Sequence, residues 1–195
     1  MATSVSERSK KLSRLFAFLI VVGMIAMVFG YFGPIIHRSE TTFDAGSNVS
    51  KLVNEDKEIR KKGAEEIAET GTTNKTGFKG VGALKFFSTA VFVLGIVTVV
   101  WFVLLCVLYI ENPELIYLVI GGLTVLASIL SFIFVLIVLS SYRKYYGTLP
   151  GVEDVSSLYG LGFGAICLPV GGLLLGCGTA GMALTTPKVE VLHKG

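Results

Sequence analysis

Four long apolar runs, almost free of charged side chains, fill most of this chain. They cover Leu15–Gly33, Phe86–Ile110, Leu115–Ser141 and Ser157–Thr185. A helix needs about 20 apolar residues to cross the roughly 30 Å hydrocarbon layer of a bilayer. The sequence therefore predicts an all-α membrane protein, a four-transmembrane-helix bundle with a long polar loop between helices 1 and 2.

The charged residues divide the rest of the chain into tails and loops. They make up only 16% of the 195 residues, whereas a soluble domain carries about 25%. Most lie in the N-terminal tail Met1–Arg14 and in the loop Arg38–Lys85. The short turn Glu111–Glu114 makes helices 2 and 3 antiparallel neighbours. We expect one transmembrane domain over residues 15–185, with a C-terminal tail over residues 186–195.

The first apolar run follows a basic segment, as the core of a signal peptide does. It is longer than the usual apolar core of about 7–15 residues, and no small-residue cleavage pattern follows it. We therefore expect a retained first helix. A cleaved signal is the alternative.

Two features favour a cytosolic N-terminus. Basic residues lie directly before the first span and tend to stay inside. The long loop also contains two N-x-[ST] sequons, at Asn48 and Asn74, which are candidate glycosylation sites on the outer side. This topology predicts that both termini are cytosolic and that the chain is a multi-pass glycoprotein of the plasma membrane or secretory pathway. An organellar membrane is the alternative.

A third feature favours the opposite orientation. The long loop holds nine Lys or Arg residues, and Arg143 and Lys144 directly follow helix 3. Loops shorter than about 60 residues count in the positive-inside rule. Eight acidic residues offset the nine basic ones, and we keep the cytosolic N-terminus as the favoured orientation.

Part of the long loop has the pattern of a solvated helix. Ser50–Thr70 is rich in helix formers, and opposite charges stand four residues apart, as in Asp56/Arg60 and Lys61/Glu65. Gly71 can end this helix. We expect one side of it to rest on the membrane domain, although a protein-binding or membrane-surface role stays open.

No catalytic or metal-binding pattern is visible. The four runs contain no Asp, Glu, Lys, Arg or His, the residue types that mark ion pathways in membranes. His37 and His193 are far apart in sequence, and the three cysteines lack metal-ligand spacing. The net charge of +3 is too small to indicate nucleic-acid binding. We expect neither enzyme activity nor a cofactor.

Hydroxyl groups are the polar side chains available inside the spans. They can line a path in an oligomeric pore, although interhelical hydrogen bonds also explain them. The candidates are Ser88, Thr89, Thr98, Thr124, Ser128 and Ser131.

Small residues recur along the fourth apolar run. Such residues let helix backbones approach closely, which is a main source of helix association in lipid. We expect packing within the bundle, with a contact to another subunit as the alternative. Pro169 is expected to kink this helix. The ridge residues are Gly160, Gly164, Gly172, Gly176 and Ala180.

Tyrosines gather near the ends of the spans, where their amphipathic rings fit the membrane interface. They are Tyr109, Tyr117, Tyr142, Tyr145, Tyr146 and Tyr159.

The order of helices and loops resembles that of the claudin-like tetraspan group. Shared features are the short tails, the long first loop Arg38–Lys85 and the very short turn Glu111–Glu114. The Trp and Cys signature of claudin first loops is missing, because residues 38–85 contain neither Trp nor Cys. The resemblance therefore covers topology only. It implies a role in adhesion or in modulating a partner membrane protein.

Together these features predict a non-enzymatic structural or auxiliary subunit of a membrane assembly. Its partners are the lipid bilayer and either another membrane protein or a second copy of itself. A small oligomeric channel or transporter with a hydroxyl-lined path is the alternative function.

Overall fold

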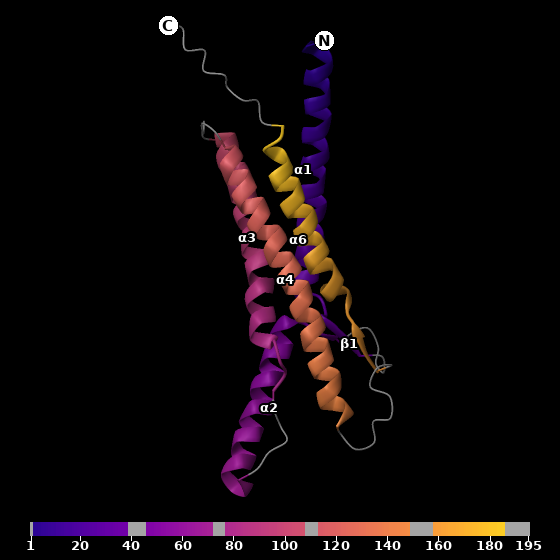
Figure 1. The fold of residues 1–195 in the computed structure, drawn as a ribbon, viewed down its shortest axis with the longest axis vertical. Coiled ribbons are helices and arrows are strands. Elements are labelled where there is room, and N and C mark those ends of the chain that lie inside the picture. Colours follow the sequence, from indigo (N-terminus) through magenta and orange to yellow (C-terminus); the bar gives the residue numbers. More distant parts are fainter. Residues whose placement is uncertain (1, 39–45, 72–76, 108–112, 149–157, 186–195) are drawn as a thin grey trace.

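The computed structural model describes residues 2–38, 46–71, 77–107, 113–148 and 158–185, and long helices form most of this part of the chain (Figure 1). The helices are α1 (Ala2–Phe32), α2 (Val49–Thr70), α3 (Val81–Val107), α4 (Glu114–Gly147) and α6 (Phe163–Met182). Three short strands accompany them: β1 (Ile36–Arg38), β2 (Gly46–Ser47) and β3 (Tyr159–Leu161). Four helices, α1, α3, α4 and α6, are long and apolar enough to cross a membrane. The predicted four-helix membrane bundle is confirmed.

The four apolar helices pack in the spatial order α1, α6, α4, α3, and α1 also contacts α3 (Figure 1). Helices α1 and α4 run in one direction along the bundle, and α3 and α6 run in the other. The N-terminal end of α1 and the C-terminal end of α6 therefore lie at the same end of the bundle. Helix α2 and the strands lie at the opposite end.

Glycines bring α6 close to both of its main neighbours. A Cβ added to Gly23 of α1 would lie 2.5 Å from the backbone nitrogen of Leu175, and one added to Gly121 of α4 would lie 2.6 Å from that of Ala180. No real Cβ tolerates such distances, so only glycine fits at these crossings. Because lipid supplies no hydrophobic drive, this close contact is what holds the helices together.

Large apolar side chains cover the outward faces of the other helices. Their exposure fits a surface that contacts lipid chains, which are as apolar as the protein core. Examples are Phe18, Val21, Ile25 and Phe29 on α1, Val93, Val100 and Val103 on α3, and Leu118, Leu126 and Ile133 on α4.

A small antiparallel sheet joins the end of α1 to the start of α6. The strand order is β2-β1-β3, and Ile36 pairs with Ser47 on one side and with Leu161 on the other. The backbone nitrogen of Gly162 also donates to the carbonyl of Ile35 at 2.9 Å. The sheet is not predictable from the sequence, because its strands are only two or three residues long.

The bounds of the helices differ from the predicted spans. Helix α1 begins at Ala2, within the predicted tail, because no Pro or Gly interrupts the chain before Gly23. Helix α3 begins at Val81 rather than Phe86. Helix α6 begins at Phe163 rather than Ser157, because residues 159–161 pair with β1. Of the predicted turn Glu111–Glu114, residues 111–112 lie outside the described residues, Pro113 is the N-cap of α4, and Glu114 begins that helix.

Helix α4 is longer than a bilayer is thick. Its 34 residues span about 50 Å at about 1.5 Å per residue, against roughly 30 Å of hydrocarbon. The last turns, from Tyr142 onward, contact α2 and β3 and extend past the predicted span Leu115–Ser141. This extension brings α4 into contact with α2, which belongs to the polar loop between the first two membrane helices.

Candidate functional site

Helix α2 has a defined beginning and end. At its start, the side-chain Oδ1 of Asn48 accepts a hydrogen bond from the backbone nitrogen of Lys51 at 2.9 Å. At its end, Gly71 adopts a left-handed conformation, with φ of 74°, and its nitrogen donates to the carbonyl of Ile67. These are standard helix caps. The predicted helix over Ser50–Thr70 is thereby confirmed as Val49–Thr70.

One face of α2 is buried against the end of the bundle. Leu52 is fully buried, and Ile59 and Gly63 lie on the same face of the helix. Beyond Gly63 the remaining residues are exposed, apart from the partly buried Glu66. The first two thirds of α2 are therefore docked, and the last turns project away from the bundle (Figure 1).

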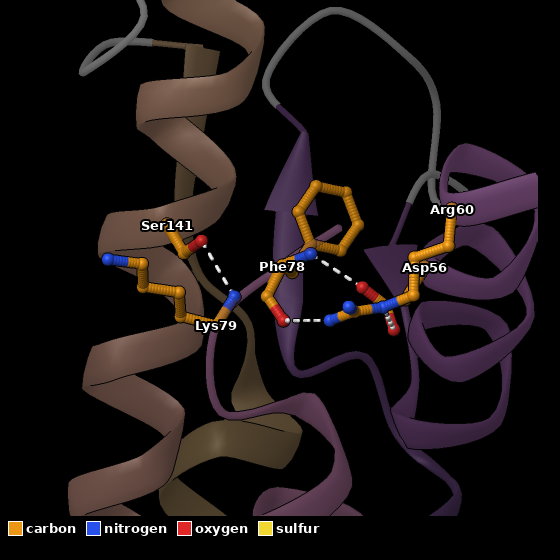
Figure 2. A network of polar contacts seen from close by, with 5 residues as sticks. All are labelled: Asp56, Arg60, Phe78, Lys79 and Ser141. Carbon is orange, nitrogen blue, oxygen red and sulfur yellow. Dashed lines mark hydrogen bonds and ion pairs between the residues drawn. The ribbon is translucent and has the colours of Figure 1, made fainter. Parts of the chain in front are cut away.

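An ion pair on α2 holds the segment that leads into α3. The Asp56 carboxylate accepts the backbone N–H of Phe78 at 2.5 Å and pairs with the Nε of Arg60 at 2.8 Å. Arg60 in turn donates to the carbonyl of Phe78 at 3.4 Å. Figure 2 shows both side chains reaching the backbone of Phe78 from the side of α2, one at its nitrogen and the other at its carbonyl oxygen. Both backbone groups of Phe78 are therefore bonded to α2.

The next residues attach the same segment to α4. The backbone nitrogen of Lys79 donates to the Oγ of Ser141 at 2.9 Å (Figure 2). Gly80 has φ of 84°, a conformation that L side chains rarely adopt, and it turns the chain into α3. Residues 78–80 therefore link α2, α3 and α4.

Tyrosines of α4 form the other part of this contact. Tyr142 donates to the carboxylate Oε1 of Glu55 at 3.2 Å, and Tyr146 donates to the same oxygen. The ring of Tyr142 also packs on Phe78, with ring centroids 4.8 Å apart. Burial, together with the nearby Glu55 carboxylate, raises the pKa of both phenols above their usual range. Both groups are therefore neutral donors at physiological pH.

We call this contact region the α2 junction. Its members come from α2, from the segment before α3 and from the end of α4. They are Glu55, Asp56, Arg60, Phe78, Ser141, Tyr142 and Tyr146. Arg143 extends the region to the sheet, because its Nε donates to the carbonyl of Tyr159 at 2.8 Å.

The opposite face of α2 is exposed and charged. We call it the α2 outer face. Lys61 and Glu65 lie 3.9 Å apart on it, with side chains that are 79% and 61% exposed. Its residues are Asn54, Lys57, Glu58, Lys61 and Glu65, all exposed. The junction therefore fixes one face of the helix and leaves this face free to contact another molecule.

The small residues predicted along the fourth run separate into three groups. Gly164 faces α1, where an added Cβ would lie 2.7 Å from the carbonyl oxygen of Gly33. Gly172 and Gly176 face α4, as does Ala180. Gly160 lies in β3 instead of the helix, with no neighbouring atom within 4 Å of an added Cβ. The helical members of the ridge therefore make contacts inside the bundle.

The remaining predicted positions are placed as follows. Asn48 caps α2 through Oδ1, whereas a glycan would be attached to the side-chain nitrogen. Asn74 lies outside the described residues. Pro169 is buried within α6, which continues through it without interruption. Among the described residues, no group of three or more His, Cys, Asp and Glu could hold a metal ion.

The buried hydroxyls of the spans have partners inside the protein. Thr124 and Ser128 each donate to a carbonyl four residues earlier in α4, both at 2.7 Å. Ser88 and Ser131 bond to each other across α3 and α4 at 3.2 Å. Of the described buried side-chain nitrogen and oxygen atoms, only the Nε1 of Trp101 has no partner.

Parts of the α2 junction are recognisable in the sequence, but their association is not. The Asp56/Arg60 pair and the tyrosines near the end of α4 both stood out. The contacts of Glu55 with Tyr146 and of Asp56 with Phe78 span 91 and 22 residues. No local periodicity signals such pairs.

Comparisons with known proteins identify no relative: no family model, no curated protein and no solved structure matches this chain.

Proposed function

We propose that this protein is a non-enzymatic structural or auxiliary subunit of a membrane assembly, and that the α2 outer face contacts its partner. The observation that carries the proposal is the α2 junction. Three charged side chains of α2, Glu55, Asp56 and Arg60, and two tyrosines of α4 hold this helix in a defined position on the bundle. A helix that served only to cover the end of the bundle would not need so many directional bonds.

The composition of the α2 outer face supports a protein as the partner. The α2 outer face mixes Lys57 and Lys61 with Glu58 and Glu65, so it has no strong net charge. Alternating charges of this kind give an interface specificity rather than general affinity for one sign of charge. In the last turns of α2, Ile67 is half-exposed and continues the face of Ile59 and Gly63 beyond the docked part of the helix.

The bundle supports a scaffolding role. Its helices α1, α4 and α6 meet through glycines that leave no space for side chains between them. The buried hydroxyls described above bond to carbonyls or to each other. No observation on the described residues favours a hydroxyl-lined path, and we do not develop the channel alternative further.

The proposal includes an orientation. Residues 38–85 lie on the extracytosolic side, both termini are cytosolic, and the protein resides in the plasma membrane or secretory pathway, where Asn48 and Asn74 are glycosylated. Glycosidase treatment should then increase the electrophoretic mobility of the wild-type protein. The double variant Asn48→Asp with Asn74→Gln should show no such change in mobility. Asp at position 48 keeps the helix cap, because it caps as well as Asn does. Labelling of a Ser4→Cys variant from outside intact cells would contradict this orientation.

Purification in mild detergent tests the assembly. The wild-type protein should elute as a stable particle larger than its own monomer. The double change Lys57→Glu and Lys61→Glu should release the monomer, because like charges would then gather on the α2 outer face. The control, Lys57→Arg with Lys61→Arg, keeps the charges and should keep the particle. A wild-type protein that is strictly monomeric would contradict the proposal.

A further inference from the structure

The end of α1 away from the α2 junction carries a cluster of positive charge. Lys10, Lys11 and Arg14 are exposed on this helix, and the apolar run begins directly after them at Leu15. None of the three forms an ion pair with another described side chain. We call these three residues the α1 basic cluster.

Helix geometry gives the depth of this cluster. With the hydrocarbon layer taken to begin at Leu15, where the apolar run starts, the continuous helix places Arg14 at its boundary and Lys10 about 6 Å further out, at about 1.5 Å per residue. The headgroup layer on each side of a bilayer is about 5–8 Å thick. All three charges therefore lie among the lipid headgroups, and long basic side chains extend readily into that layer.

The charges of this segment are not balanced within it. Residues 1–14 contain four basic residues and one acidic residue, Glu7. Lys10 and Arg14 stand four apart and repel each other on one helix face. At the other end of the bundle, nine basic and eight acidic residues share the segment 38–85. The net charge of residues 1–14 is therefore +3 (four minus one), against +1 (nine minus eight) for the segment 38–85.

We infer that the α1 basic cluster binds the headgroups of anionic phospholipids in the adjacent leaflet. The depth of the cluster favours a lipid over an acidic protein, because headgroup phosphates already surround these side chains. An anionic headgroup placed between Lys10 and Arg14 relieves their repulsion. This binding is independent of the proposed role of α2.

Native mass spectrometry of the full-length protein in detergent tests the inference, with phosphatidylserine and phosphatidylcholine as probes. Each basic side chain near an anionic surface favours binding by about fivefold. Changing Lys10, Lys11 and Arg14 to Gln should therefore raise the apparent Kd for the first phosphatidylserine by about fivefold or more. Binding of phosphatidylcholine should not change. The preference should also weaken from 0.15 M to 1 M ammonium acetate, since the screening length falls from about 8 Å to about 3 Å.

Three further measurements complete the test. The change of Lys10 and Lys11 to Arg with Arg14 to Lys keeps the charges and should keep the preference. Neutralising Lys51 and Lys62, which are exposed on α2 but do not belong to the α2 outer face, should not change the preference for phosphatidylserine. Inorganic phosphate at the same concentration as the lipid should not displace phosphatidylserine from the wild-type protein.

Four results would overturn the inference. The first is equal binding of phosphatidylserine and phosphatidylcholine by the wild type, and the second is an equal loss of phosphatidylserine binding in the α2 variant. The third is displacement of phosphatidylserine by inorganic phosphate. The fourth is a loss of phosphatidylserine binding only when Lys79, Lys85 and Lys144 at the other end are neutralised.

Discussion

At the scale of single residues, replacing Asp56 should disturb more of the contacts that dock α2 than any other single change. Its side chain is only 13% exposed, and it bonds both Arg60 and the backbone of Phe78. Asp56→Ala leaves a part-buried N–H without its partner and frees the guanidinium. We expect the docking of α2 to weaken by roughly 2 kcal/mol, seen as faster hydrogen exchange of the α2 amides.

The Lys61/Glu65 pair provides the matched control. It has the same spacing on the same helix, but both side chains are mostly exposed. Changing both residues to Ala should cost no more than about 0.5 kcal/mol. If this variant loosens α2 as much as Asp56→Ala does, the junction is not what holds the helix.

The junction tyrosines give the docking a dependence on pH. A phenol whose pKa is raised in the folded state stabilises that state below its unfolded pKa of about 10. This stabilisation is lost as the pH rises above 10 toward the higher folded pKa. Burial, and then Glu55, cause the shift. We therefore expect α2 to undock only in strong alkali.

Tyrosinate absorbance measures this effect directly. Because their pKa values are raised, Tyr142 and Tyr146 should ionise in a late step that accompanies undocking. Tyr146→Phe should shrink this late step. A single titration of all tyrosines near pH 10 would show that the two phenols are not buried beside Glu55.

At the scale of elements, two adjacent glycines in α4 allow the effect of helix packing to be measured separately from that of helix propensity. A Cβ on Gly121 would lie 2.6 Å from the backbone of α6, whereas one on Gly122 meets nothing within 4 Å. Gly121→Ala should destabilise the bundle by about 1–3 kcal/mol through overpacking. Gly122→Ala should be neutral or slightly stabilising. Thermal unfolding in detergent compares them, and equal effects would contradict the close α4–α6 contact.

Much of the element scale was predictable from the sequence. Apolar length locates the four spans, and helix-forming residues before Gly71 locate α2. Contacts between residues that are far apart in the chain could not be predicted from the sequence. Gly160 looked like a helix-packing residue until pairing of β3 with β1 removed it from the helix. The junction was hidden for the same reason, since Asp56 and Phe78 meet only in the fold.

At the scale of the whole molecule, the two ends of the bundle differ in kind. One end carries the α1 basic cluster, which suits a membrane surface. The other carries α2, held by the junction with its charged outer face exposed. Between them, glycine contacts make α1, α6 and α4 a compact unit. The proposed function depends on α2 keeping one position on this unit, because a partner recognises a surface only if that surface is presented consistently.

A distance measured across the junction tests this most directly. Spin labels at Glu58→Cys on α2 and Thr148→Cys after α4, with the native cysteines replaced, can be measured by pulsed electron resonance in lipid nanodiscs. We expect one narrow distance distribution, which broadens when Asp56→Ala is added. A broad distribution in the protein with Asp56 intact would contradict this expectation.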